Sequence, residues 1–359
     1  MAAIVTFGEI MARMAPRGVE RLRQILPGSL DVTFAGAEAN TAVSLALLGC
    51  DVDFVTALPN NPLADACLAS LRGTGVGTRH VRITADGRLG IFFVETGANQ
   101  RPTQVHYDRD HSSISRSGPG EFCWEEILEG TRWLHLTGIT AALSETAAEL
   151  TIEAAATARR LGVEVSFDVN FRSKLWRWDG AGHPQQLARR VLLRLLPHVS
   201  LWFMSEEDCG LLGLAPEVLS GSGTRAERLV QAAKSVRQQF PGIRYFAGTF
   251  REQISASHNN WSGLLFDATA DITTQAPLRD GGVQPWEIRQ IVDRVGSGDA
   301  FAAGILFGLC QPNPDLQYTI DFATAAGCLA HSISGDWNYV SRQEIEDVMR
   351  SAGAGRVVR

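Results

Sequence analysis

The amino-acid sequence predicts an α/β protein with a mostly parallel central sheet, helices on both faces and a small β-sheet lid. Three observations point to this fold. Short β-prone runs alternate with helical patterns along most of the chain, as in parallel sheets built from βαβ units. The 359 residues are enough for a large core with an appendage. Two β-rich segments interrupt the alternation and would form the appendage.

The alternating elements can be placed by their periodicity. Strands are expected at Ile4–Glu9, Asp53–Leu58, Trp133–Ile139, Val163–Asn170, Leu201–Met204 and Tyr245–Thr249. Helices are expected at Glu38–Leu48, Pro62–Leu71, Ser144–Leu161, Gln185–Leu196 and Thr224–Gln239, and later near Leu316–Ser332 and Ser341–Arg350. A buried helix after Gly298 carries Phe301, Ile305 and Leu309 on one face.

The two interrupting segments, 11–34 and 88–111, are β-like and turn-rich, and neither offers a convincing helix. We expect them to form a small antiparallel sheet, a lid on an α/β domain made of residues 1–10, 35–87 and 112–359. Two long surface loops are the alternative. Loops of this length in a compact domain are usually functional, which favours the lid.

Composition excludes several classes of function. A net charge of −6 argues against a protein that grips nucleic acid or an anionic membrane. The only lysines are Lys174 and Lys234, so no Gly-Lys pair exists and a Walker-type P-loop is excluded. The six cysteines form no C-x-x-C pair and are expected to be reduced thiols. No signal peptide or membrane-spanning run is evident, so a cytoplasmic location is expected.

The turn Gly296-Ser297-Gly298 has the properties of an anion site. It precedes a helix that is almost entirely small and apolar, so the helix N-terminus points at the turn. The first amides of a helix lack partners within the helix and carry a partial positive charge. Glycines let an anion approach these amides closely. The turn is therefore a candidate phosphate site without any basic side chain.

Asp299 stands in the first turn of the same helix. It could be an acid that only stabilises the helix dipole, which is common. Because the helix is expected to be buried, an unpaired carboxylate there is costly unless it is used. An anion site beside an Asp that accepts a proton is the minimum equipment for moving a phosphoryl group onto a hydroxyl. Asp299 is thus the candidate catalytic base, with Gly296, Ser297 and Gly298 stabilising the transferred group.

Two segments resemble the signatures of the ribokinase-like (phosphofructokinase-B type) carbohydrate kinases. DRVGSGDAFAAG, which begins at Asp293, resembles the C-terminal signature with its anion hole and catalytic base. FAGAEANTAVSLALLG, from Phe34 to Gly49, resembles the sugar-binding signature near the N-terminus. The resemblance covers nearly the whole chain. It implies a Rossmann-like ribokinase fold with a β-lid, ATP as donor and Mg²⁺.

Within that family the chain most resembles the 2-keto-3-deoxygluconate kinases, which phosphorylate a terminal hydroxyl. Six stretches carry this resemblance: Arg294 in DRVG, Val105–Arg109, Phe167–Arg172, Ile333–Asp336, Thr249–Glu252 and Ser255–Trp261. The resemblance assigns these residues to the sugar: Gly36, Ala37, Asn40, Phe92, Tyr107, Arg109, Arg172 and Asp336. The arginines suit an acidic sugar, because a guanidinium binds a carboxylate through paired donors. Either arginine alone would be read as a surface or salt-bridging residue.

The resemblance also implies a nucleotide and a metal site. It assigns to the nucleotide Ser205, Thr249, Arg251, Asp293, Gly296 and Gly298. It implies that Asp208 organises Mg²⁺ through water. In this family the lids often pair, so a homodimer through the lid sheet is possible for this chain.

Two departures from the family pattern leave alternatives open. Phe92 stands where a tyrosine is expected, which puts the exact sugar in doubt. Ser205-Glu-Glu-Asp208 stands where N-x-x-E is expected, which weakens the metal assignment. A kinase for fructose or a related keto-sugar acid is therefore one alternative. A sugar sensor without catalysis is another, although a pure binder has no need of Asp299.

Overall fold

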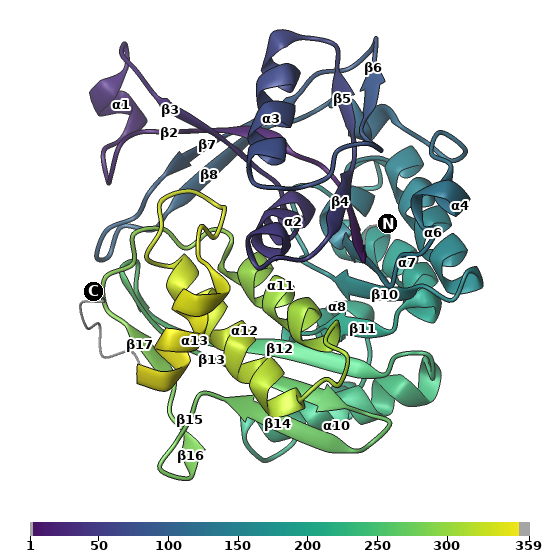
Figure 1. The fold of residues 1–359 in the computed structure, drawn as a ribbon, viewed down its shortest axis with the longest axis vertical. Coiled ribbons are helices and arrows are strands. Elements are labelled where there is room, and N and C mark those ends of the chain that lie inside the picture. Colours follow the sequence, from purple (N-terminus) through teal and green to yellow (C-terminus); the bar gives the residue numbers. More distant parts are fainter. Residues whose placement is uncertain (1–2, 352–359) are drawn as a thin grey trace.

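The computed structural model describes residues 3–351, whose main body is a nine-stranded sheet (Figure 1). Its strands are β1 (Ile4–Phe7), β4 (Val52–Val55), β9 (Trp133–Thr137), β10 (Glu164–Asp168), β11 (Leu201–Phe203), β12 (Tyr245–Ser255), β13 (His258–Asp267), β14 (Ile272–Ala276) and β17 (Trp286–Ile288). The order is β14-β13-β12-β11-β10-β9-β1-β4, with β17 paired to β13. Every pair from β4 to β12 is parallel. The prediction of a mostly parallel sheet is confirmed.

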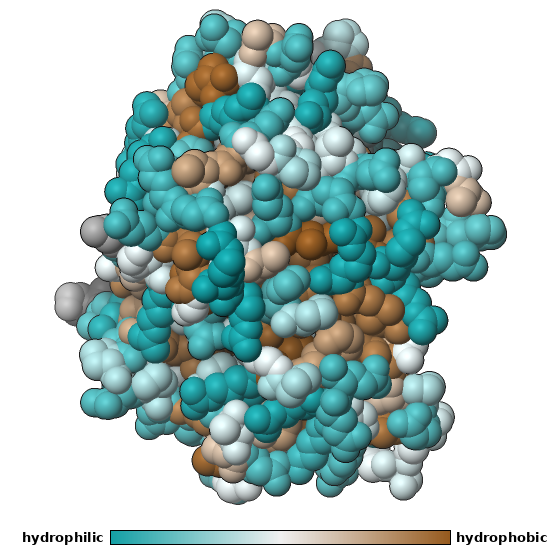
Figure 2. All heavy atoms as spheres, turned by 90° about the vertical axis from the view of Figure 1, so that its right-hand side faces the viewer, coloured by the Kyte–Doolittle hydropathy of each residue, from teal (hydrophilic) through white to brown (hydrophobic). Residues whose placement is uncertain are grey.

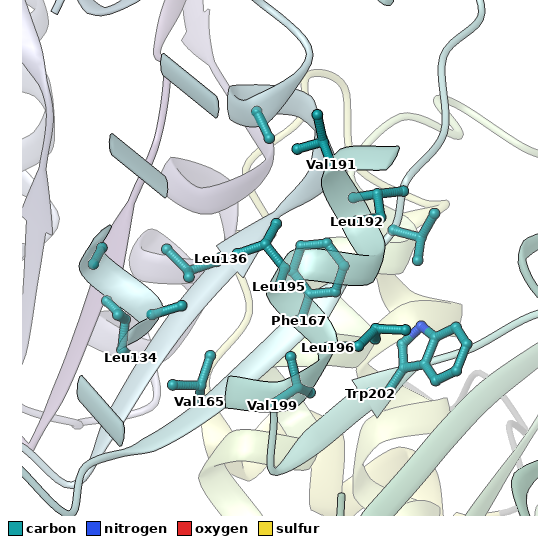
Figure 3. Packing of buried hydrophobic residues seen from close by; sticks show 14 of the residues in the cluster. Leu134, Leu136, Val165, Phe167, Val191, Leu192, Leu195, Leu196, Val199 and Trp202 are labelled. Carbon is teal, nitrogen blue, oxygen red and sulfur yellow. The ribbon is translucent and has the colours of Figure 1, made fainter. Parts of the chain in front are cut away.

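Helices cover both faces of this sheet. The long ones are α2 (Ala37–Leu47), α3 (Pro62–Gly73), α6 (Glu145–Arg160), α7 (Pro184–Leu195), α10 (Arg225–Gln239), α11 (Ser297–Leu309), α12 (Leu316–Ala330) and α13 (Arg342–Ser351). Side chains alternate across a strand, so neighbouring residues enter different cores. Leu134 and Leu136 join the core under α6 and α7 (Figure 3), whereas Trp133 joins the core under α2 and α11.

Short elements connect these layers. They are α1 (Leu22–Ile25), α4 (Trp124–Ile127), α5 (Gly138–Ala141), α8 (Glu206–Leu212), α9 (Pro216–Leu219), η1 (Ile114–Arg116), η2 (Leu196–His198), β5 (Ala57–Pro59), β6 (Arg82–Thr84), β15 (Leu278–Arg279) and β16 (Gly282–Val283). A capping box begins α10, since the side chains of Thr224 and Glu227 each accept the other's backbone amide hydrogen.

The two β-rich segments pair into a second sheet that projects from the main body (Figure 1). Its strands are β2 (Met11–Ala15), β3 (Asp31–Ala35), β7 (Gly90–Glu95) and β8 (Gln104–Asp108), in the order β3-β2-β7-β8. The expectation of a purely antiparallel sheet was wrong, because β2 and β7 are parallel. The antiparallel pairs of this sheet are β2–β3 and β7–β8, and in each pair the two strands follow one another in the sequence. The first segment also holds the short helix α1, which was not expected.

The largest element missed from the sequence is the hairpin of β12 and β13. A strand was expected to end at Thr249, but β12 continues to Ser255 and pairs antiparallel with β13. The extension FREQIS is mostly polar and exposed, so it lacks the apolar alternation by which strands are recognised. The hairpin matters because its tip approaches the second sheet. The Ala256 amide donates to the Asn99 carbonyl oxygen at 2.7 Å.

The surface and the cysteines agree with the composition. Figure 2 shows that hydrophilic residues cover most of the face on the right of Figure 1, with hydrophobic patches between them. Within residues 3–351, no helix is both long and apolar enough to cross a membrane. All six cysteines are free thiols: Cys67 and Cys209 are buried and Cys123 is exposed.

Candidate active site

A cavity of about 760 Å³ lies between the second sheet and the carboxyl ends of the central strands. Open α/β sheets place their ligands at this edge. Nearly all the residues singled out from the sequence line it: Gly36, Ala37, Asn40, Phe92, Tyr107, Arg109, Arg172, Ser205, Asp208, Thr249, Arg251, Gly296, Ser297, Gly298, Asp299 and Asp336. Segments far apart in the chain thus meet around one space.

Gly296 begins helix α11 at the cavity wall. Its φ of +85° lies in the left-handed region that favours glycine. A Cβ there would also overlap the carbonyl oxygen of Asp336, so no other residue fits. The Ser297 hydroxyl donates to the Arg294 carbonyl oxygen at 3.1 Å, which fixes the turn. The first amides of α11 are thereby aimed at the cavity.

Asp299 lies in the first turn of α11 and lines the cavity. The side-chain amide of Asn40, on α2, donates to Asp299 Oδ2 at 2.7 Å. Burial, and then the nearby carboxylates of Asp168, Asp336 and Glu38, raise the pKa of Asp299 to about 8, although the Asn40 bond opposes the rise. A carboxyl with such a pKa is a strong proton acceptor once ionised.

Asn40 is held in turn by the start of α2. Its Oδ1 accepts from the Gly36 amide at 3.2 Å, so its NH₂ group faces Asp299. A Cβ on Gly36 would overlap the carbonyl oxygen of Glu9, which makes glycine necessary at this cap. In the structure Asn40 is therefore bound to the carboxylate of Asp299, whereas the sequence suggested a contact with sugar hydroxyls.

Two acids of this region were missed from the sequence. Asp168, at the end of β10, lines the cavity, and burial raises its pKa to about 6. Glu38 is fully buried, and burial raises its pKa to about 6 against hydrogen bonds donated by Thr137 and Thr140. The strand-end sequence Asp-Val-Asn could have revealed Asp168. We call Asp168, Asp299, Asp336 and Glu38 the acidic cluster.

Five arginines of the described part of the chain also line the cavity, and two of them, Arg109 and Arg225, form ion pairs with glutamates. We call the other three, Arg172, Arg251 and Arg294, the arginine cluster. Arg172 and Arg251 are exposed, and within residues 3–351 neither forms an ion pair with a carboxylate. Burial and the nearby charge of Arg172 lower the pKa of Arg251. Burial and the charge of Arg251 lower that of Arg294. Like charges held this close favour an anionic ligand.

The second sheet contributes an aromatic and basic wall. Phe92 and Tyr107 are cross-strand partners with ring centroids 5.9 Å apart. Arg109 is buried, lies 5.2 Å from the Tyr107 ring centroid and forms an ion pair with Glu9. Arg109 was expected to meet a sugar carboxylate. Its charge is already balanced by Glu9, which leaves Arg172 as the freer of the two arginines.

Asp293 is the one predicted site residue that does not reach the cavity. It is 3% exposed and forms an ion pair with Arg13 of β2. Its Oδ1 accepts from the amides of Arg294, at 2.8 Å, and Val295, at 3.2 Å. These partners keep the carboxylate of Asp293 inside the protein, and the contact expected between Asp293 and a nucleotide stays a prediction.

Ser205 and Asp208 form a capping box at the start of α8. Asp208 Oδ2 accepts from the Ser205 amide at 2.9 Å and from its hydroxyl at 2.6 Å. Burial raises the pKa of Asp208 to about 7, and the charge of Asp168 adds to the rise. In residues 3–351, no cluster of three or more His, Cys, Asp or Glu side chains could hold a metal ion directly.

Comparison with known proteins identifies the family. The model of the pfkB family of carbohydrate kinases matches residues 1–242. The chain belongs to this family. The kinase is 32% identical over 357 residues to a 2-dehydro-3-deoxygalactonokinase of Haloferax volcanii, covering 99% of this chain and 98% of the relative. It is 28% identical to a fructokinase of Klebsiella pneumoniae over 342 residues, 92% of this chain and 94% of the relative.

A solved relative shares both the fold and much of the sequence. The crystal structure of a 2-dehydro-3-deoxygluconokinase from Thermotoga maritima is 39% identical to this kinase, with a TM-score of 0.85. The match covers 97% of this chain and 99% of that chain. The predicted ribokinase-like fold and carbohydrate kinase family are confirmed.

Proposed function

We propose that this carbohydrate kinase transfers the γ-phosphoryl group of ATP to the terminal hydroxyl of 2-keto-3-deoxygluconate (2-dehydro-3-deoxygluconate). The observation that carries the proposal is the position of Asp299. It stands on the first turn of α11, beside the amides at Gly296–Gly298 and inside the cavity. A proton acceptor and an anion site are thereby within one helical turn of each other.

The residues of this chain divide the reaction between them. Asp299 takes the proton of the terminal hydroxyl, whose oxygen forms a bond to the γ-phosphorus as the bond to ADP breaks. The amides at Gly296–Gly298 stabilise the charge that develops on the transferred group. Asn40 orients the carboxylate of Asp299 through its 2.7 Å hydrogen bond.

The sugar acid is proposed to lie between the acidic cluster and the second sheet. Arg172 binds its carboxylate, and Tyr107 and Arg109 close the wall. Gly36, Ala37 and Asp336 contact the rest of the molecule. Met11, Ala35 and Phe92 line the cavity from a small apolar cluster of the second sheet. Such a wall suits the methylene group of a deoxy sugar better than a hydroxyl, which would find no partner there.

The nucleotide is proposed to lie along Ser205, Thr249 and the arginine cluster. Arg251 and Arg294 balance the charge of its phosphates. Two carboxylates, Asp168 and Asp208, line both the main cavity and a side cavity of about 110 Å³. Their oxygens suit Mg²⁺. Burial, and to a lesser extent neighbouring carboxylates, raise both pKa values, and a cation would offset both effects. With too few protein ligands to bind it directly, Mg²⁺ would be held through water and would neutralise phosphate oxygens.

We also propose that the second sheet acts as a lid. Residues 11–34 and 88–111 would close over the sugar, on the α/β domain of residues 1–10, 35–87 and 112–359, and so exclude water from the phosphoryl group. Val32, on an outer strand of the sheet, is 50% exposed, which fits pairing of two lids in a homodimer. A cytoplasmic location would supply ATP and keep the six thiols reduced.

A neutral sugar such as fructose is the second candidate substrate. It is favoured by the ion pair between Arg109 and Glu9, which leaves Arg172 alone to bind a carboxylate. The two candidates make opposite demands on that arginine. A neutral sugar does not need its charge, whereas a sugar acid does.

The test is release of ADP from ATP and Mg²⁺ in the presence of 2-keto-3-deoxygluconate, its galacto epimer, fructose, ribose or gluconate. Turnover restricted to the keto-deoxy acids supports the proposal. Faster turnover of fructose supports the second candidate instead. Sugar binding without turnover of any substrate would show a sensor and refute the proposed function.

A further inference from the structure

A buried arginine of the second sheet joins that sheet to the turn Gly296–Gly298, which we call the phosphate turn. Arg13, on β2, is 3% exposed and does not line the cavity. Its Nη1 contacts Asp336 and its Nη2 contacts Asp293. The two carboxylates lie 43 positions apart, one before the turn at Gly296 and one on a later loop. A single guanidinium therefore bridges three separate parts of the chain.

Each carboxylate is attached to backbone that shapes the site. Asp293 accepts from the amides of Arg294 and Val295, just before Gly296, and from the Gly335 amide at 3.3 Å. Asp336 follows Gly335, lines the cavity and carries the carbonyl oxygen against which Gly296 packs. Moving Arg13 would therefore move the phosphate turn and one wall of the cavity together.

The register of the second sheet places Arg13 beside the sugar wall. Arg13 is the cross-strand partner of Phe92, and Phe92 is the partner of Tyr107. Directly opposite residues on neighbouring strands lie on the same face of a sheet. Arg13, Phe92 and Tyr107 thus form one row that faces the α/β domain. Arg13 contacts Asp293, just before the turn, and Asp336, whereas the two rings line the cavity.

The charges around Asp299 give the arginine an electrostatic effect as well. Asp168 comes from β10, Glu38 from α2 and Asp336 from the late loop, and all three disfavour ionisation of Asp299. Arg13 is the cation paired with Asp336. Removing it would leave Asp293 and Asp336 unbalanced next to a site that must also admit an anionic substrate. Such unpaired buried charges are costly.

We propose that Arg13 is a positioning residue for phosphoryl transfer. It holds the phosphate turn and Asp336 in place and balances the charges of the Asp293 and Asp336 carboxylates. The second sheet and the phosphate turn are thereby fixed relative to each other. Arg13 touches neither sugar nor nucleotide. It acts through Asp293 and Asp336. The inference rests on the proposed phosphoryl transfer, but it does not depend on which sugar is the acceptor.

The experiment compares Arg13→Met and Arg13→Lys with the wild-type kinase, using ATP, Mg²⁺ and the best acceptor of the sugar panel. Arg17→Met is the matched control, because Arg17 pairs with Asp31 in the same lid segment but is 85% exposed in its side chain. Each variant is assayed for kcat, for KM of both substrates and for the pH dependence of kcat/KM. Thermal melting gives the folded fraction, to which rates are normalised.

Arg13→Met is expected to lower kcat about 10²-fold, as small misplacements at a reacting centre do. The pH at which kcat/KM is half-maximal should rise, because the unbalanced carboxylates oppose ionisation of Asp299. Arg13→Lys should lie in between, since an ammonium can balance charge but cannot bridge both acids. Arg17→Met should match the wild type. If Arg13→Met does not fold, Arg13→Gln carries the same expectations.

The inference would be contradicted if the Arg13 variants had a lower melting temperature but no other change. If folded Arg13→Met or Arg13→Gln keeps the kcat and the pH profile of the wild type, Arg13 only stabilises the fold and the inference is overturned. Failure of the proposed function looks different, because the wild-type kinase itself would then release no ADP with any sugar.

Discussion

The acidic cluster and the arginine cluster of the cavity differ in how the protein holds them. Asp299, Asp336 and Glu38 are fixed by hydrogen bonds or an ion pair, from Asn40, Arg13 and two threonines respectively. Arg172 and Arg251 are exposed, and the Arg172 side chain donates to the carbonyl oxygen of its neighbour Phe171, at 3.0 Å. Other side chains thus hold three members of the acidic cluster in place. In the arginine cluster only Arg294 is held, by the carbonyl oxygens of Ser255 and Ala256, whereas Arg172 and Arg251 extend into solvent.

The difference fits the two tasks that a kinase must perform. A proton acceptor has to be in place before the reaction, so its orientation is built into the protein. Arginines that receive a ligand can adjust to it, and their charge acts over a distance. We therefore expect substitutions in the acidic cluster to change kcat, and substitutions in the arginine cluster to change KM.

The largest effect is expected for Asp299→Asn. Asparagine keeps the size of the side chain but cannot accept the proton, so kcat should fall by about 10²- to 10⁴-fold or more. Binding of ATP, measured by calorimetry, should remain. Asp347→Asn, on α13 with its side chain 39% exposed, is the control and should leave kcat unchanged. Retention of kcat by Asp299→Asn would remove Asp299 from the reaction.

A smaller effect, on KM, is expected for Arg172→Met. Loss of a charge-assisted hydrogen bond of about 1.5–3 kcal/mol corresponds to a 10- to 150-fold rise in KM for the sugar acid. The KM for fructose should not change, because a neutral sugar does not need the charge. Arg177→Met, in the same loop and also exposed, is the control. An equal rise of KM for both sugars would show that Arg172 does not bind the carboxylate of the sugar acid.

The acidic cluster also predicts the pH dependence of the reaction. With the pKa of Asp299 raised to about 8, kcat/KM should increase as pH rises toward that value, because more of the base is ionised. Asp168→Asn removes one of the charges that raise this pKa, so the rising limb should move to lower pH. Assays from pH 6 to 9 would measure the shift. An unmoved limb would mean that another group controls it.

Much of the fold and the membership of the site could be predicted from the sequence, and the reasons are local. The alternation of strands and helices predicts the parallel sheet. The glycines before α11 predict a turn that lines the cavity, where the proposed anion site lies. The ion pairs could not be predicted. Arg13 reaches Asp336 only because β2 folds back across the domain, and nothing in MARMAP shows it. The ion pair of Asp293 with Arg13 was missed for the same reason, since the two residues are remote in the chain.

The smallest expected effect concerns stability, and it would sharpen the contrast between the clusters. The folded protein keeps a proton on Asp299 up to about pH 8, whereas an unfolded aspartate releases it near pH 3.8. Between these values the folded state binds more protons, so the free energy of unfolding falls as pH rises. Asparagine carries no charge and escapes this loss. Asp299→Asn should therefore melt about 2–4 °C above the wild type at pH 8, with a smaller difference at pH 5.

The same melting series with Arg172→Met should show no gain at pH 8. Arg172 is exposed, so removing its charge relieves no burial. Asp347→Asn should change the melting temperature in the opposite direction, because a hydrogen bond from Arg350 lowers the pKa of Asp347. Losing that carboxylate cannot stabilise the protein near neutral pH. If Asp299→Asn also fails to gain stability as pH rises, the carboxylate of Asp299 is not destabilised in the folded protein, and burial in the acidic cluster does not make it a stronger base.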